Sequence, residues 1–164
     1  MEIREVVATE SVVPDEAVFS MAVVLVILLY AAWFITWGGT VMASCTMADA
    51  KSLGGAMIYS CLFYLGAILS LPAHPLGRVG TIASLPLCLA LIWQTAWGAT
   101  LFVVVNANGL SACNLMIGEG YGEARGGWLE YVYAPYYLVV SVGSLAAILL
   151  SYRRQSRIRR ETLP

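Results

Sequence analysis

Two pairs of tryptophan residues are spaced so that their indole rings could form a stacking surface. Residues 33–40 and 93–100 share the pattern W-x-x-x-W-G-small-T and lie 60 positions apart. Tryptophans four residues apart lie on one face of a helix, so each segment would present two neighbouring indoles. Such a surface could stack a lipid, a quinone-like ring or a partner helix, or it could be an aromatic belt at a membrane interface. The indoles concerned are Trp33, Trp37, Trp93 and Trp97.

Gln94 lies between the second pair and is the only strongly polar side chain within the apolar runs. In a membrane such groups usually face other helices and bond across them, so we expect an interhelical hydrogen bond. The alternative is a polar contact for a neutral solute, in a cavity near Gln94, Thr36 and Thr40.

The elements that carry these residues are short of charge. Of 164 residues 60% are hydrophobic and 12% are charged, with a net charge of -1. A soluble domain carries about 25% charged residues. The mean hydropathy of +0.78 indicates that lipid covers much of the surface. This composition argues against a soluble domain, a disordered chain and a nucleic-acid binder, which would need a basic surface.

The few charges divide the chain into four apolar runs. Between Phe19 and Val105 the only charged residues are Asp49, Lys51 and Arg78. Each run reaches or approaches the ~20 residues that cross a bilayer. We therefore predict an all-α integral membrane protein with a four-transmembrane-helix bundle. Its expected parts are an N-terminal segment 1–14, helices 15–44, 49–71, 78–105 and 129–152 with an outer loop 106–128, and a basic tail 153–164.

A repeat within the chain favours two tandem two-helix hairpins. Besides the tryptophan pattern, residues 65–69 and 145–149 read Leu-small-Ala-Ile-Leu. Both hairpins would begin on the same side, so their pseudo-twofold axis would lie along the membrane normal. The alternative is chance matching in a chain rich in Trp, Gly and Thr.

The basic residues predict the orientation. Four crossings place both termini on one side, which then holds seven of the nine basic residues, against Lys51 and Arg125 on the other. The positive-inside rule puts both termini in the cytoplasm. The tail arginines enforce this orientation, and they could also bind anionic inner-leaflet lipid at about 1 kcal/mol per basic residue. They are Arg153, Arg154, Arg157, Arg159 and Arg160.

The outer loop is the expected surface for a partner protein. Residues 118–127 contain five glycines but no Lys-Ser/Thr, so they do not form a phosphate-binding loop. The aromatic residues at its end suit an interface belt or a docking surface. The candidate contacts are Glu119, Glu123, Arg125, Trp128, Tyr131 and Tyr133.

Four cysteines and one histidine limit the cofactor chemistry. The chain has no C-x-x-C, which argues against a dithiol oxidoreductase. Cys61 and Cys88 lie within predicted helices and are expected to be buried. Met42, Cys45 and Met47 are soft ligands, but methionine is usually filler in apolar helices, so no metal is expected. The single histidine, His74, excludes bis-histidine haem within one chain, and we expect no cofactor.

The uncharged helices argue against a membrane enzyme and against ion-coupled transport, because both need ionisable groups near the bilayer. The expected function is that of a non-enzymatic tetraspan protein. It would be an accessory subunit or organiser of a membrane complex, with the bilayer and other membrane subunits or a second copy as partners. The alternative is a small oligomeric channel or carrier for a neutral or lipidic solute. No nucleic acid is expected to bind.

Cys45 and Cys113 could form a disulfide, because both are predicted on the outer side, which is oxidising in a secretory or periplasmic setting. The bond would join the two hairpins. The mobility difference between reducing and non-reducing gels should therefore disappear in Cys113→Ser. A difference that persists in this variant would contradict the bond.

Overall fold

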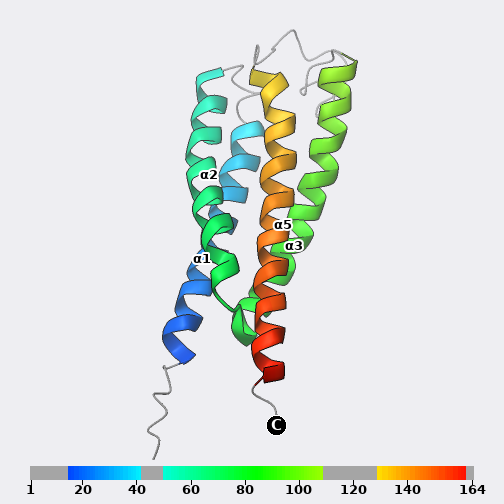
Figure 1. Ribbon diagram of the computed structural model, residues 1–164. Helices are drawn as coiled ribbons and strands as arrows, with labels where there is room; N and C mark the ends of the chain where they lie inside the picture. The colour runs from blue at the N-terminus through cyan, green and yellow to red at the C-terminus, as the bar shows by residue number, and fades with distance from the viewer. Residues whose placement is uncertain (1–14, 42–49, 109–128, 162–164) are drawn as a thin grey trace, which may run out of the picture.

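The computed structural model describes residues 15–41, 50–108 and 129–161, and their regular structure is entirely helical (Figure 1). An all-helical chain is what the sequence predicts. In chain order the helices are α1 (Asp15–Val41), α2 (Ala50–Ser70), the short 3₁₀ helix η2 (Leu71–Ala73), α3 (Gly77–Leu101), the π-helix η3 (Phe102–Ala107) and α5 (Leu129–Glu161).

Within the described residues, four helical segments are long and apolar enough to cross a membrane, in agreement with the number predicted. They are Met21–Gly39, Gly54–Ala73, Gly77–Ala107 and Tyr131–Glu161. The η2 segment contains Pro72 and forms the tight turn between the second and third of them.

The four long helices lie side by side (Figure 1). Helix α1 packs against α2 and α3, and α5 packs against the same two, so α1 lies diagonally opposite α5 and α2 opposite α3. The beginning of α1, η2 and the end of α5 lie at one end of the molecule, called here the link end (Figure 1). The other end, where α1 finishes and α2 and α5 begin, is called the loop end.

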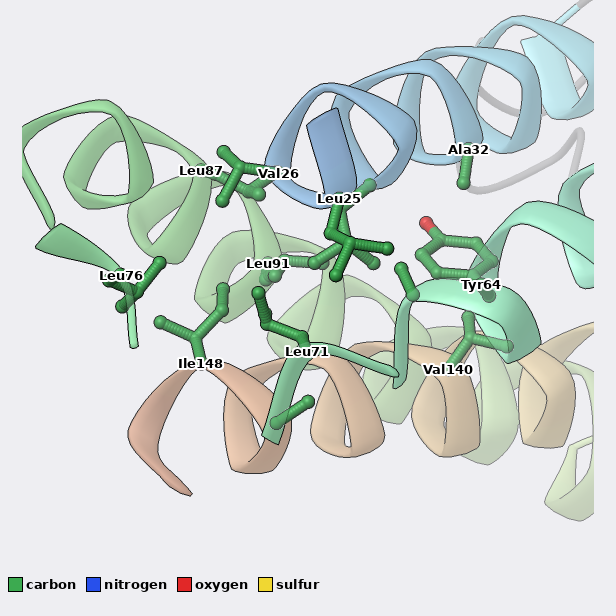
Figure 2. Packing of buried hydrophobic residues seen from close by; sticks show 13 residues of the cluster. Leu25, Val26, Ala32, Tyr64, Leu71, Leu76, Leu87, Leu91, Val140 and Ile148 are labelled. Carbon is green, nitrogen blue, oxygen red and sulfur yellow. The ribbon is translucent and has the colours of Figure 1, made fainter. Parts of the chain in front are cut away.

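The core near the link end is aliphatic, and it draws on all four helices and η2 (Figure 2). Three serines are also buried in this half, Ser84, Ser144 and Ser151, and each donates to a backbone carbonyl. We call the set of buried leucine, isoleucine and valine side chains the aliphatic layer. Its members are Leu25, Val26, Leu29, Leu71, Leu76, Leu87, Leu91 and Ile148.

Helix α5 continues beyond its predicted end at residue 152. Residues 153–161, expected to be a tail, extend the helix to Glu161. Arginine and glutamine are good helix formers, and no proline or glycine interrupts them. The extension also has tertiary contacts, because Thr81 Oγ1 of α3 donates to Gln155 Oε1 at 3.3 Å. One turn earlier, the Ser151 hydroxyl donates to the carbonyl of His74.

Pro86 lies inside α3, where it removes the backbone donor for the carbonyl four residues earlier. The next carbonyl, that of Ala83, accepts a 2.9 Å hydrogen bond from the Tyr30 hydroxyl of α1. Neighbouring helices commonly supply such donors beside a proline. This bond also fixes the rotation of α1 relative to α3, which decides where the tryptophans lie.

Three glycines mark the closest helix contacts, and at one of them, Gly98 of α3, an added Cβ would lie 3.1 Å from Tyr137 Cβ of α5. A Cβ at Gly143 of α5 would lie 3.1 Å from Ile68 Cδ1 of α2, as the small-x-x-x-small pattern of Gly143 and Ala147 predicts. A Cβ at Gly39 of α1 would overlap the Cβ of Ala56 in α2. By contrast, nothing lies within 4 Å of a Cβ added at Gly66.

Gly39→Ala should lower the unfolding free energy by about 1–3 kcal/mol, because the added methyl overpacks the contact between α1 and α2. The matched control Gly66→Ala should raise it by up to about 1 kcal/mol, since alanine favours a helix over glycine. Denaturant unfolding in mild detergent measures both changes. Equal effects at the two positions would contradict the observed helix packing.

Candidate functional site

Gln94 is the centre of a buried polar network that reaches three helices. Its side chain is 1% exposed and points from α3 between α2 and α5. Its Nε2 donates to Ser141 Oγ of α5 at 2.8 Å and, more weakly, to the Tyr64 hydroxyl of α2 at 3.4 Å. The interhelical role expected of this glutamine is therefore seen in the structure.

Tyrosines extend the network to the fourth helix. The Tyr137 hydroxyl of α5 donates to the backbone carbonyl of Thr36 in α1 at 3.2 Å. The Thr36 side chain itself donates to the carbonyl of Ala32 in its own helix at 2.7 Å. Bonds thus cross both diagonals of the four-helix arrangement, α1 to α5 and α2 to α3.

A second branch joins α2 to α5 one turn closer to the loop end. The hydroxyls of Ser60 and Tyr136 lie 2.6 Å apart and share a hydrogen bond. The Tyr136 hydroxyl also lies 3.2 Å from the carbonyl of Met57, and Ser60 Oγ lies 2.6 Å from that of Ala56. Sequence reasoning did not predict that Tyr133 and Tyr137 lie in the interior. The signal for them was their spacing of one helical turn, which continues to Ser141.

Not every buried polar atom in the described residues has a partner. The network leaves Gln94 Oε1 and the Tyr133 hydroxyl without a hydrogen bond, and Trp33 Nε1 and Asn106 Nδ2 are also buried and unpartnered. All four atoms come from the half of the described helices nearer the loop end. A buried unsatisfied polar group costs about 1–3 kcal/mol, so such a concentration calls for a physical account.

Each tryptophan pair forms a stacked unit on its own helix. The ring centroids of Trp33 and Trp37 are 6.3 Å apart with planes at 9°, and those of Trp93 and Trp97 are 6.2 Å apart with planes at 4°. Trp37 and Trp93 are 38% and 50% exposed, while the other two indoles are half-buried. The ring contacts found in the described residues do not join one pair to the other.

The two pairs pack against different parts of the core. Trp33 packs against the cluster that contains the aliphatic layer. Trp97 packs against a second cluster, nearer the loop end, made of Leu101, Val105, Tyr133, Ala134 and Tyr137. Convergence of the two pairs into one aromatic surface is therefore not seen among the described contacts.

The repeated sequence pattern does not correspond to repeated packing. Phe34 is 64% exposed, whereas its counterpart Gln94 is 1% exposed. Likewise Thr36 is buried while its counterpart Ala96 is exposed. The two hairpins, α1 with α2 and α3 with α5, turn different faces of the shared pattern inward. Equivalent positions therefore do not form equivalent parts of a site.

Of the residues expected at a partner-binding surface, the structure describes Tyr131 and Tyr133, and these two differ in exposure. Tyr131 is exposed at the beginning of α5, but Tyr133 is only 3% exposed and packs against Tyr137, with ring centroids 4.4 Å apart. The helix turns Tyr133 inward because it lies one turn before Tyr137. Tyr133 is therefore a core residue, contrary to expectation. Glu119, Glu123, Arg125 and Trp128 lie outside the described residues.

The other predicted groups are placed as follows. Arg153, Arg154, Arg157, Arg159 and Arg160 are exposed around the α5 extension, and Arg78 is exposed at the beginning of α3. Cys61 and Cys88 are free and half-buried. Cys45, Cys113, Met42 and Met47 lie outside the described residues. Among the described residues, no three His, Cys, Asp or Glu side chains gather as a metal site would require.

No protein-family model matches the chain, and no curated protein or solved structure is significantly similar to it. The function must therefore be argued from the chemistry of the network and of the surface.

A double-mutant cycle measures whether the Gln94–Ser141 bond joins α3 to α5. Gln94→Leu and Ser141→Ala should be coupled by about 0.6 kcal/mol and at most about 1.7 kcal/mol, the range for interhelical bonds in membrane proteins. The control pairs Gln94→Leu with Ser144→Ala, because Ser144 bonds within its own helix to the Val140 carbonyl. Unfolding free energies in detergent give both couplings. The bond would be refuted by a Ser141 coupling as small as that of the control.

Proposed function

We propose that the chain is a four-helix membrane-spanning bundle with both termini in the cytoplasm. We further propose that it serves as a non-enzymatic accessory subunit or organiser of a membrane protein complex. The observation that carries this proposal is the contrast between its interior and its surface. The interior combines aliphatic side chains with an uncharged hydrogen-bonded network, while large apolar side chains are exposed on all four long helices.

The direction of the helices supports the orientation. The beginning of α1 and the end of α5 lie at the link end, together with the exposed arginines of α5 and Arg78 (Figure 1). The positive-inside rule assigns that end to the cytoplasm. The first arginines of the extension can reach anionic headgroups, which would anchor this end through charge as well as burial.

The interior gives little support to an enzyme. Between Met21 and Gly39, Gly54 and Ala73, Val79 and Ala107, and Tyr131 and Tyr152, the chain has no Asp, Glu, Lys or Arg. General acid–base catalysis and ion coupling both need an ionisable group in reach. The network offers hydroxyl and amide groups, which position and bond without carrying charge.

The surface of α2 is the part best suited to a partner helix. Large apolar side chains project from it along most of its length, among them Ile58, Leu62 and Leu69. Gly55 and Gly66 lie eleven residues apart and hence on one face, and nothing lies within 4 Å of a Cβ added at either. Small residues on an exposed face let another backbone approach closely, which is how membrane helices associate.

A second candidate is a small channel or carrier for a neutral solute. It is favoured by the unpartnered atoms beside Gln94 and by the absence of charge among the described core residues. The aliphatic layer opposes a continuous path through one chain, because its leucines close the centre of the bundle. We therefore favour the accessory role.

Native mass measurement after mild detergent extraction tests the accessory role. The protein should carry a partner subunit or a second copy, and Gly66→Leu should reduce the bound fraction by filling the accessible face of α2. Gly38→Leu is the matched control, because nothing lies within 4 Å of a Cβ at that α1 position either. A strictly monomeric wild-type protein with no copurifying subunit would overturn the proposal.

A further inference from the structure

The buried polar groups of the described residues differ between the two halves of the core. Towards the link end, each buried serine has a bond: Ser84 to the Thr81 carbonyl, Ser144 to the Val140 carbonyl and Ser151 to the His74 carbonyl. Towards the loop end lie the four buried atoms without a partner. The shortage of hydrogen bonds is therefore confined to one half of the molecule.

The chemistry of the unpartnered atoms indicates what would satisfy them. Gln94 Oε1 is an acceptor, Trp33 Nε1 is a donor, and the Tyr133 hydroxyl can do either. Flipping the Gln94 amide would leave its nitrogen, and no longer its oxygen, without a hydrogen bond, because Ser141 and Tyr64 lie on the same side of the amide. No charged side chain faces the described network. The complement is a small uncharged molecule that both donates and accepts, and water has these properties.

We propose that water hydrates the loop-end half of the core as far as Gln94, and that the aliphatic layer stops it there. The molecule would then contain a blind, one-sided hydrated compartment, open towards the outer side of the membrane. This inference rests on the membrane-spanning orientation proposed above, and it does not depend on partner binding.

The aliphatic layer has the properties of a seal. Its leucine, isoleucine and valine side chains come from α1, η2, α3, α5 and the link before α3, and α2 adds Ala67 beside them (Figure 2). The serines buried in the same half already donate to backbone carbonyls. Hydrophobic constrictions of this kind exclude water by dewetting. The bundle can thus be wet on one side of Gln94 and remain tight to ions and solutes.

The path from the outer side passes along α3 and α5. Asn106 lies in the π-helix η3, about three turns beyond Gln94 towards the loop end, and its Nδ2 is one of the unpartnered atoms. Tyr133 lies two turns beyond Ser141 in the same direction. Single-turn π segments are frequent at functional sites, where they redirect side chains. Polar groups therefore occur at successive depths, as a chain of water molecules would need. They adjoin a second apolar cluster, whose buried side chains include Leu101, Val105 and Ala134.

Two buried serines of α5 provide a matched test. Ser141 and Ser144 are both fully buried, lie three residues apart, and accept replacement by cysteine with little change in volume. Ser141 contacts Gln94, whereas Ser144 bonds only to its own helix in the described contacts. The experiment introduces Ser141→Cys or Ser144→Cys after replacing the four native cysteines with serine or alanine. The reconstituted protein is then treated with a small, charged methanethiosulfonate reagent added on the outer side.

The Ser141→Cys thiol should react at least about tenfold faster than the Ser144→Cys thiol, because only a hydrated thiol ionises to the reactive thiolate. Adding Gln94→Leu should slow the reaction at position 141. Intact-mass spectrometry follows the labelling, and the elution volume and tryptophan fluorescence check that each variant is folded.

Tyr131→Cys, exposed near the loop end, reports which side of the membrane that end faces. If it reacts only from the opposite side, the proposed orientation is wrong, and the serine comparison is made from that side. Hydration of the core is overturned if Tyr131→Cys reacts quickly while both buried cysteines react equally slowly. The seal at the aliphatic layer is overturned if both buried cysteines react as quickly as Tyr131→Cys.

Discussion

The amide of Gln94 makes the interaction on which the rest of this structure depends. The exposed faces of these helices are apolar as well, so burial alone does not specify which faces meet. Gln94 bonds to Ser141 and Tyr64, and Tyr137 bonds to the backbone of Thr36. These bonds cross both diagonals of the four helices and are satisfied in one relative rotation. In that rotation the helices also pack closely at Gly39 and Gly143.

Sequence reasoning succeeded where charge carried the signal and was limited where it did not. The four apolar segments were predictable because charges end them, and the interhelical bond of Gln94 was predictable because an isolated amide needs a partner. The inward position of Tyr133 was not predicted, because an interfacial tyrosine and a core tyrosine look alike in sequence. The helical extension of α5 was also missed, because tertiary bonds from Thr81 and Ser151 support residues that charge alone marks as a tail.

The core divides into an aliphatic layer and a polar network, and this division links the fold to the proposed role. The aliphatic layer closes the bundle near the link end, where the arginines of α5 and Arg78 gather. The network keeps hydroxyl and amide groups in the other half without any charge. Under the proposed accessory role, the accessible face of α2 is the surface that would contact a partner helix.

The most direct test of this account is an experimental density map of the protein in a lipid nanodisc, at a resolution that shows side chains. The account predicts four helices crossing the disc, with the Gln94 amide between Ser141 and Tyr64, and with Tyr133 directed into the core. A map in which Gln94 faces lipid, or in which the helices lie along the surface of the disc, would contradict it.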